Sequence, residues 1–384
     1  MSGVSRTGRR PGRRGASDRP LDSGAGGLSE TDPDRPRRFG RLAPGDRVAV
    51  VAPSGPVDPV RLEKGCGILR ELGLRVTVAE HALADTLLAD AGLTDAGQAE
   101  AGPSAEAGAA REGRQRIAGA DADRAADLTA AWCDPGVRAV LCARGGYGAT
   151  RVLDHLDWDR LAAPPGGTAP KILHGSSDIT ALHMAFGRRL GVTTSFGPMV
   201  ASELFTEGTD GGTADDDWHR RSLEHFRAVL FGSASAADGR TGTEITGTRV
   251  LREGTAEGPL TGGTLSLLAA LTGTPYAPPP ATGRIVFLED VAEAPYRVDR
   301  MLTQLLQAGW FDGAAGIALG AWPGCGDPAE LDAVFAGRLG PLGVPILAGL
   351  PVGHGPRQLT LELGAPYRLD THARTLDAQP GGVR

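Results

Sequence analysis

The stretch DRVAVVAPSGPVDPVRLEKGCGILRELGLRVTVAE (residues 46–80) decides the fold class. It begins with an apolar, β-branched run that ends at Pro-Ser-Gly-Pro, which is the pattern of a buried strand followed by a loop. A segment with helical spacing comes next and closes at Gly73, and the run LRVTVAE (74–80) again has the composition of a strand. Strand, helix and strand in this order predict a parallel sheet with right-handed crossovers.

The same pattern recurs at VRAVLCARGGYGATRVLDHL (137–156) and at KILHGSSDITALHMAFGRRLG (171–191). We therefore expect residues 42–200 to form one doubly wound α/β domain. Within it, residues 88–120 are rich in Ala, Gly and Glu with weak periodicity, which indicates an insertion or a loosely ordered helix and loop.

A second domain is expected at 249–372, after a polar linker region at 201–248 that holds one helix at 215–232. Residues 373–384 are expected to form a polar tail. The patterns in the second domain predict a glycine turn opening a short helix at 258–275, a strand at 283–290, an amphipathic helix at 296–311 and strands at 316–322, 345–351 and 359–370.

Composition excludes several classes of protein. The formal net charge is −6 and apolar residues make up 41%, so no general affinity for nucleic acid or an anionic membrane is indicated. No apolar run is long enough for a transmembrane helix, and the start of the chain does not resemble a secretory signal. The four cysteines form no C-x-x-C pair and are interpreted as reduced thiols, with Cys142 buried.

Residues 1–41 differ from the rest of the chain. Arginine, glycine, proline and serine dominate, and the first aromatic residue is Phe39. Such a segment buries too little apolar surface to offset its ordering entropy, so we interpret it as a disordered tail. A nucleic-acid-binding arm is the alternative, although acidic residues are mixed among the arginines.

Chemistry-bearing residues gather where strands end, which is where ligands bind in open α/β sheets. The stretches are ARGGYG (143–148), GSSD (175–178), LEDVAE (288–293) and GLPVGHGP (349–356). In GSSD, Ser177 would occupy the sharp turn between strand and helix, the position of an exposed nucleophile in hydrolases. The pattern G-x-S-x-G is not met because Ile179 replaces its last glycine, and an ordinary helix cap is the alternative.

A catalytic serine needs a base and an orienting acid. His354 stands between two glycines after a strand, in a context that leaves the imidazole exposed. His174 and His183 are interpreted as structural, and His81 shows no acidic partner. The histidines in polar, surface-like contexts are His155, His219, His225 and His372.

For the orienting acid, Glu289 lies at the carboxyl end of a buried strand, and buried carboxylates are rare unless paired. Asp290 and Glu293 are near alternatives, and Glu289 could instead cap the following helix. The turn at Gly145 and Gly146 could present N–H groups to an oxyanion. It could also cradle a phosphate, although G-x-G-x-x-G and a Walker lysine are absent, and no metal-binding motif or cofactor is indicated.

Taken in order across 42–372, these segments resemble the LD-carboxypeptidase family of serine peptidases, which includes the microcin-immunity enzymes. The matching segments are GDRVAVVAPSGPV, DLTAAWCDPGVRAVLCARGGYGATRVLDHLD, KILHGSSDITALH, GPLTGGTLSLLAALTGTPY, IVFLEDVAEAPYRVDRMLTQLLQAG and LPVGHGPRQLTLELG. The resemblance implies a flavodoxin-like N-terminal domain with a parallel sheet and a smaller, barrel-like mixed β/α C-terminal domain.

The resemblance also implies a cytoplasmic, homodimeric enzyme that cleaves the amide between an L-centre and a terminal D-amino acid. Its typical substrate is a muropeptide tetrapeptide, from which D-alanine is released in cell-wall recycling. The Ser-Glu-His triad maps to Ser177, Glu289 and His354, and the oxyanion hole maps to the backbone N–H groups of Asp178 and Gly146 (or Gly145). Alternatives are a microcin-type peptidyl-nucleotide amidase and a non-catalytic peptide-binding protein.

Three positions depart from the family pattern. Ser176 stands where an aromatic is usual, Phe196 where a histidine is common, and Thr264 where an asparagine is common. All three are expected near the site, where they would affect substrate preference more than the triad.

Overall fold

The computed structural model describes residues 36–89, 115–163, 170–206, 214–232 and 243–379. Most of the predicted N-terminal tail and of the 88–120 insertion lies outside these residues. Residues 32–384 group into one compact unit. Along the described part of the chain, no helix is long and apolar enough to cross a membrane.

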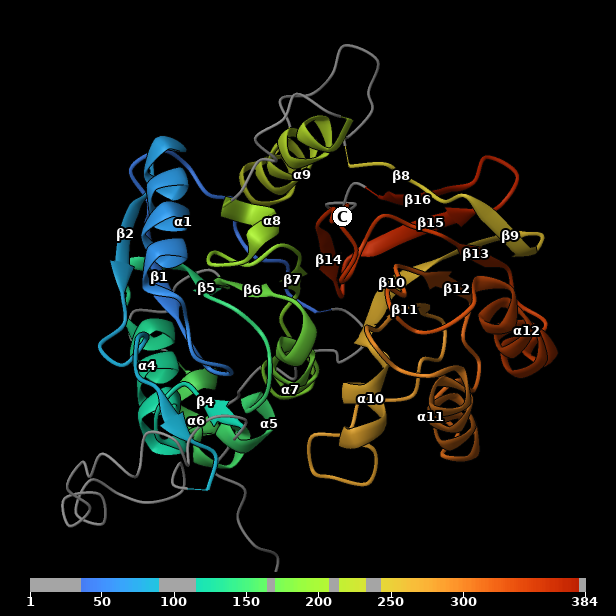
Figure 1. The fold of residues 1–384 in the computed structure, drawn as a ribbon, viewed down its shortest axis with the longest axis horizontal. Coiled ribbons are helices and arrows are strands. Elements are labelled where there is room, and N and C mark those ends of the chain that lie inside the picture. The colour runs from blue at the N-terminus through green and yellow to red at the C-terminus, as the bar shows by residue number, and fades with distance from the viewer. Residues whose placement is uncertain (1–35, 90–114, 164–169, 207–213, 233–242, 380–384) are drawn as a thin grey trace, which may run out of the picture. The chain divides into compact units, whose positions relative to one another are not determined.

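The predicted parallel sheet is present, as six strands in the order β2-β1-β5-β6-β7-β14 (Figure 1). Its first five strands pair in parallel, and β14 pairs antiparallel with β7. The order is that of a flavodoxin-like sheet, which confirms the expected class. The strands are β1 (Arg47–Val51), β2 (Arg75–Val78), β5 (Val137–Cys142), β6 (Ile172–Gly175), β7 (Thr194–Phe196) and β14 (Leu361–Leu363).

Helices cover both faces of this sheet because alternate residues of each strand point to opposite faces. Val48 and Val50 of β1 belong to a buried cluster with residues of α1 and α9, whereas Ala49 and Val51 belong to one with residues of α4 and α7. The elements around the sheet are α1 (Pro59–Glu71), α4 (Asp121–Cys133), α5 (Ala149–Val152), η1 (Leu153–His155), α6 (Trp158–Ala162), η2 (Ser177–Ile179), α7 (Thr180–Leu190), α8 (Glu203–Thr206), α9 (Ala214–Phe231) and a short ladder of β3 (Thr86–Leu87) with β4 (Arg116–Ile117).

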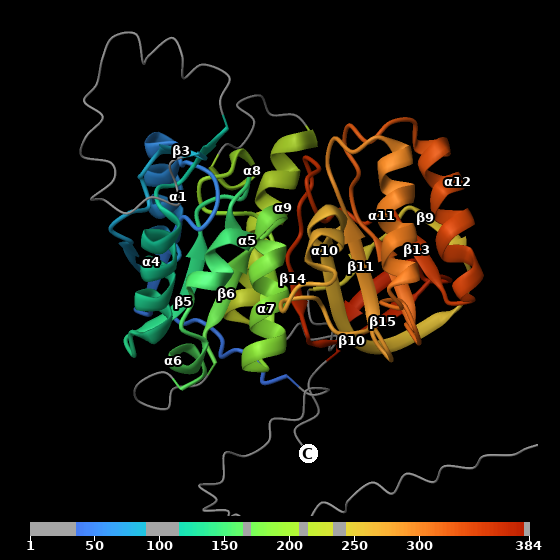
Figure 2. The same ribbon diagram turned by 90° about the horizontal axis from the view of Figure 1, so that it is seen from below.

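The C-terminal part of the chain contains a curled eight-stranded sheet in the order β8-β16-β15-β10-β11-β12-β13-β9 (Figure 1). Strands β10 to β13 are parallel, and the outer strands are antiparallel. Helices α10, α11 and α12 lie beside one another along it (Figure 2). The elements are β8 (Ile245–Thr246), β9 (Arg249–Arg252), β10 (Thr255–Thr264), α10 (Leu265–Leu271), β11 (Ile285–Glu289), α11 (Pro295–Gln307), β12 (Gly316–Leu319), α12 (Pro328–Leu339), η3 (Gly340–Leu342), β13 (Ile346–Ala348), β15 (Pro366–Asp370) and β16 (Thr375–Ala378).

Two predictions about the C-terminal strands were wrong. The glycine turn expected before α10 is the end of the long strand β10. A Cβ on Gly262 would lie 1.9 Å from the carbonyl oxygen of Phe287, so the glycine allows β10 to pack closely on β11. The single strand expected at 359–370 is two strands, because the chain turns at Gly364, where φ is +87°. Strand β14 joins the six-stranded sheet, and β15 joins the eight-stranded one.

Both ends of the folded region extend further than predicted. Phe39 is buried, and the Arg38 guanidinium forms an ion pair with Glu362 of β14 at 2.6 Å. Ordered packing therefore begins before Leu42. At the other end, the segment expected to be a tail contributes β16, which pairs with β15.

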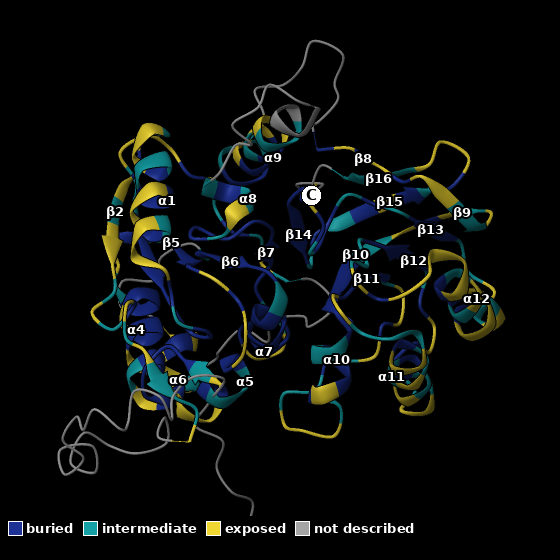
Figure 3. Cartoon of the chain, viewed as in Figure 1, coloured by how far each residue is buried: buried dark blue, intermediate teal, exposed yellow. Residues whose placement is uncertain are grey.

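The two sheets share a buried core (Figure 3). Phe196 of β7 packs edge-to-face on Phe287 of β11, with ring centroids 5.3 Å apart. One buried cluster contains residues from α4, α7, β11 and α11, and so runs from one sheet to the other. The packing of the two sheets brings the carboxyl ends of β6 and β11 close together. The candidate site lies at these two strand ends.

Candidate active site

Ser177 occupies the sharp turn predicted between β6 and the following helix. Its φ is +60°, a left-handed conformation that is unusual for a residue with a side chain. Ser176 before it has an extended backbone, with φ of −147°, and its side chain accepts a hydrogen bond from Gln358 Nε2 at 3.2 Å. The strained turn gives the two serines different surroundings, and Ser177 alone of the pair lines the cavity described below.

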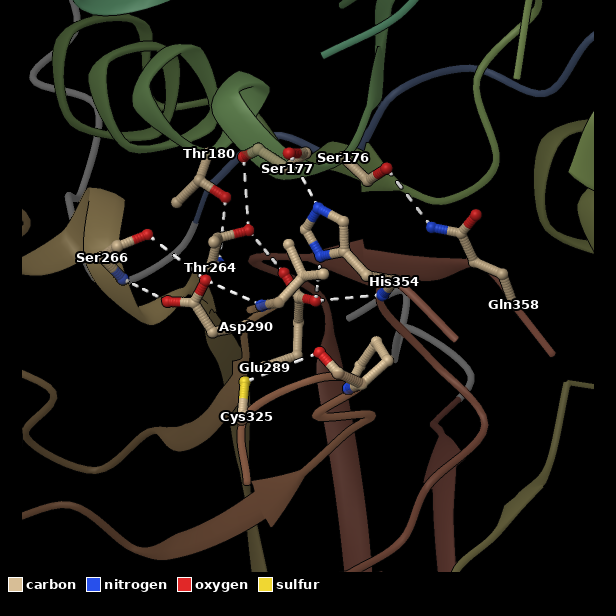
Figure 4. Close-up of polar contacts among 12 residues, drawn as sticks. Ser176, Ser177, Thr180, Thr264, Ser266, Glu289, Asp290, Cys325, His354 and Gln358 are labelled. Carbon is tan, nitrogen blue, oxygen red and sulfur yellow. Dashed lines mark hydrogen bonds and ion pairs between the residues drawn. The ribbon is translucent and has the colours of Figure 1, made fainter. Parts of the chain in front are cut away.

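Three predicted side chains from distant parts of the sequence meet at this turn (Figure 4). His354 Nε2 lies 2.9 Å from Ser177 Oγ, and His354 Nδ1 lies 2.6 Å from Glu289 Oε2. Both distances are within hydrogen-bonding range. With Nδ1–H donating to the carboxylate, Nε2 is the acceptor that faces the serine hydroxyl.

Glu289 is fully buried at the end of β11, and its contacts explain how a carboxylate is tolerated there. Its Oε2 also accepts a hydrogen bond from the backbone N–H of His354 at 3.1 Å, and its Oε1 accepts one from the Thr264 hydroxyl. A Cβ on Gly353 would lie only 2.5 Å from Oε2. Glycine at 353 therefore allows the loop to approach the carboxylate.

The N–H groups named for the oxyanion hole flank Ser177. A Cβ on Gly145 would lie 3.1 Å from Ser177 Oγ, so the glycine turn passes directly beside the hydroxyl. Gly146 has a φ of +115°. Outside helices and strands, the N–H groups of Gly146 and Asp178 donate to no backbone carbonyl in the described part of the chain.

The side chain of Asp178 ties this turn to its neighbours, a role that the sequence did not indicate. Its Oδ2 accepts hydrogen bonds from the Ser54 hydroxyl and from the N–H of Ala149, both at 2.7 Å. Buried Arg124 donates to the carbonyl oxygens of Pro53, at 2.6 Å, and Gly148, at 2.9 Å. These bonds hold the loops after β1 and β5 against the serine turn, and no local sequence pattern predicts such long-range contacts.

The electrostatics of the site raise the pKa of two groups. Burial alone would lower the pKa of His354, but the hydrogen bond to Glu289 and the charges of Glu289 and Asp290 outweigh it and raise this pKa above the ordinary 6.5. Burial raises the pKa of Asp290 to about 6, partly offset by hydrogen bonds from the N–H groups of Val291 and Ser266. The Asp290 carboxylate accepts a hydrogen bond from the N–H of Ser266 in the first turn of α10 (Figure 4). Glu289, in contrast, does not cap a helix.

A cavity of about 1130 Å³ opens in front of Ser177. Ser177, His354, Gly145 and Gly146 line it, and so do charged side chains on α1 and on the loop after β5. A volume of this size accommodates a small peptide. Among the described residues, no group of three or more His, Cys, Asp or Glu side chains is arranged to hold a metal ion.

The three departures from the family pattern lie behind the cavity and do not line it. Phe196 is in the core between the sheets, Ser176 is buried against Gln358, and Thr264 donates to Glu289. The expectation that they affect substrate preference directly is therefore not supported by their positions. Phe196 contacts the core, Ser176 contacts Gln358, and Thr264 contacts the carboxylate of Glu289.

Other histidine predictions were confirmed in part. His174 and His183 are buried and hydrogen-bonded, as expected of structural residues. His225 is buried as well, and the prediction of a surface position was wrong because α9 packs this side chain against Thr360, whose N–H donates to it at 3.1 Å. His81 has an acidic partner after all, since Asp127 of α4 lies 2.9 Å from it.

Comparison with known proteins shows which proteins this chain is similar to. Residues 48–197 match the model of the LD-carboxypeptidase N-terminal domain, and residues 257–369 match that of the LD-carboxypeptidase C-terminal domain. The chain is 45% identical over 341 residues to a putative carboxypeptidase of Streptomyces coelicolor, covering 88% of this chain and 95% of that protein. It is 31% identical over 345 residues to a probable murein peptide carboxypeptidase of Bacillus subtilis, covering 88% and 93%.

Solved structures show the same fold. The muramoyltetrapeptide carboxypeptidase of Oxalobacter formigenes matches with a TM-score of 0.64 at 27% identity, over 86% of this chain and 97% of that one. The microcin C7 self-immunity protein MccF matches with a TM-score of 0.68 over 90% and 99%, at 21% identity. The second likeness concerns the fold alone.

Proposed function

The chain belongs to the LD-carboxypeptidase family, and on that premise we propose that it is a serine carboxypeptidase that releases a terminal D-amino acid from murein tetrapeptides. The observation that carries the proposal is the hydrogen-bonded row of Ser177 Oγ, His354 and Glu289, of which Ser177 and His354 line the cavity. The likeness to murein peptide carboxypeptidases supports the choice of substrate.

The proposed reaction is acyl transfer in two steps. Ser177 Oγ attacks the carbonyl carbon next to the terminal residue and forms a C–O bond, while its proton passes to His354 Nε2. The C–N bond then breaks, and His354 gives that proton to the leaving amine. Water repeats the sequence: it attacks the ester, its proton passes through His354, and the C–O bond to Ser177 breaks.

The other groups stabilise charge during these steps. Glu289 orients the imidazole through Nδ1 and stabilises the positive charge that it carries after accepting the proton. In this proposal the N–H groups of Asp178 and Gly146 donate to the oxyanion, and such donors contribute roughly 3–4 kcal/mol each in comparable sites. A cytoplasmic location and assembly as a homodimer stay predictions of the family resemblance.

The test is incubation of the purified protein with the murein tetrapeptide L-Ala-γ-D-Glu-diaminopimelate-D-Ala, with mass spectrometry of the products. We expect free D-alanine and the tripeptide. A matched tetrapeptide ending in L-alanine should be cleaved far more slowly. A peptidyl-nucleotide amide serves as the alternative substrate, and cleavage of that compound alone, with the tetrapeptide left intact, contradicts the proposal in favour of the immunity-type reaction.

A further inference from the structure

The cavity in front of Ser177 contains three basic side chains, Arg61, Lys64 and Arg144. Two of them lie on α1 beside acidic groups. Arg61 forms an ion pair with Glu203 at 2.6 Å. The hydrogen bond from the Arg61 N–H lowers the pKa of the Asp58 carboxylate, and the nearby Lys64 charge adds to this effect. The positive charges of α1 are therefore partly compensated within the cavity wall.

Arg144 is different. It lies in the loop after β5, and among the described residues its Nη1 donates a hydrogen bond to the carbonyl oxygen of Pro56, at 3.1 Å. No carboxylate of the described chain forms an ion pair with it. A guanidinium has five N–H donors, and Arg144 lines the cavity with only the bond to Pro56 among the described residues, so donors remain for an anion.

Arg144 lies close in the chain to the glycines beside the Ser177 hydroxyl. It directly precedes Gly145 and Gly146. A Cβ on Gly145 would lie 3.1 Å from Ser177 Oγ, and a Cβ on Gly146 would lie 3.7 Å from Arg144 Nη2. Since neighbouring Cα atoms are about 3.8 Å apart, the hydroxyl and the guanidinium flank the same dipeptide.

The guanidinium is also held in place. The loop after β1 that supplies the carbonyl of Pro56 is bonded to the loop of Arg144, because the N–H of Gly55 donates to the carbonyl of Gly145 at 3.1 Å. A cation fixed in this way loses little conformational entropy when it binds an anion. Because the guanidinium and the Ser177 hydroxyl flank the same dipeptide, an anion bound by Arg144 would lie a few bonds from the attacked carbonyl carbon.

We propose that Arg144 is the specificity-determining residue that binds the free α-carboxylate of the leaving amino acid, and so confines cleavage to the C-terminal peptide bond. The inference rests on the proposed function. The carboxylate carbon is three bonds from the attacked carbonyl carbon, through the leaving nitrogen and its Cα. An Arg fork matches the two oxygens of a carboxylate, so a terminal residue is recognised by charge and by shape.

The experiment compares two tetrapeptides that differ in one group, the free C-terminal acid and its carboxamide. For the wild-type protein we expect kcat/KM to be roughly ten- to hundredfold higher for the acid, the range of a hydrogen-bonded charge. Arg144→Met should bring the ratio of acid to amide close to one, and Arg144→Lys should restore part of it. Lys64→Met removes a charge from the same cavity and should leave the ratio as in the wild type.

The outcomes separate the two hypotheses. If the wild type cleaves neither tetrapeptide, the proposed function fails and the inference fails with it. If the wild type cleaves acid and amide equally, the inference alone is overturned. The inference is also overturned if Arg144→Met lowers the rates for acid and amide by the same factor, because that result assigns Arg144 a structural role. A loss of folded protein affects both rates equally and so leaves the ratio of acid to amide unchanged.

Discussion

Ser177 and Ser176 are the same residue type with different backbone conformations, and we propose that this difference gives them different roles. The left-handed φ of Ser177 is compatible with its place between Gly145 and His354, whereas Ser176 is buried against Gln358. The strand-turn-helix pattern in the sequence put Ser177 at the turn but left an ordinary helix cap as the alternative, so its role as the nucleophile stays a prediction. The hydrogen bonds that Asp178 and Thr264 accept and donate were not predictable, because their partners lie far away in the chain.

At the same scale, the raised pKa of His354 predicts the pH dependence of activity. The imidazole must be neutral to accept the serine proton, and Glu289 stabilises its protonated form. The value of kcat/KM should therefore rise with pH through a midpoint above 6.5, since this parameter reports the free enzyme. Steady-state kinetics between pH 5 and 9 measure this midpoint.

Two variants identify the group that titrates. Glu289→Gln removes the charge that raises the pKa and leaves the burial that lowers it, so the midpoint of its residual activity should move to lower pH. Asp290→Asn removes the more weakly acting neighbour and should move it less. A wild-type midpoint below 6.5, or one that does not move in Glu289→Gln, contradicts the assignment of His354 as the base.

At the scale of elements, α1 carries two glycines whose surroundings differ. A Cβ on Gly65 would lie 1.8 Å from the carbonyl oxygen of Val200, whereas a Cβ on Gly67 would meet nothing within 4 Å. Gly67→Ala should therefore raise the free energy of unfolding by about 0.5–1 kcal/mol, because glycine in a helix interior costs that much relative to alanine. Gly65→Ala should lower it, because the helix must move away from the loop after β7.

Chemical denaturation of the two variants checks this pair. Equal effects of the two substitutions would show that helix propensity alone governs α1 and that its packing on Val200 is loose. Because the substitutions are chemically identical and two residues apart, the difference between them isolates the contact.

The elements also show where sequence patterns succeed and fail. The apolar spacing of α11 predicted a helix whose Val298, Leu302 and Leu305 are buried, as found. At 258–275 the predicted short helix is present as α10, but the predicted turn was wrong, because its glycines serve the close approach of two strands. The sheet to which each strand belongs was equally hard to predict, because β14 and β15 follow each other closely in the sequence and yet join different sheets.

At the scale of the whole molecule, the N- and C-terminal sheets share a buried core, and the chain returns from the second sheet to add a strand to the first. Strand β14 follows most of the C-terminal sheet in sequence and completes the N-terminal one, and a single buried cluster contains residues of both. The domain limits predicted at 42–200 and 249–372 stay predictions, although β14 shows that no single cut in the sequence separates the two sheets.

Shared packing predicts one cooperative unfolding transition for the two sheets. Scanning calorimetry should give a single peak whose calorimetric enthalpy equals the van't Hoff enthalpy. Leu361→Ala, in buried β14, should lower the temperature of that one peak by several degrees without splitting it. Two resolved peaks would mean that the sheets unfold independently and that the shared core contributes little.

The central claim is that Ser177 is the nucleophile, and the paired variants Ser177→Ala and Ser176→Ala test it most directly. The measurement is D-alanine released from the murein tetrapeptide, detected by mass spectrometry, with circular dichroism to check that both variants are folded. Loss of a nucleophile in a serine triad costs roughly a thousandfold or more in kcat, so Ser177→Ala should release almost none. Ser176→Ala should stay within about tenfold of the wild type, because removing one hydrogen bond typically costs about 1 kcal/mol. Release of D-alanine by Ser177→Ala at the wild-type rate would contradict the account.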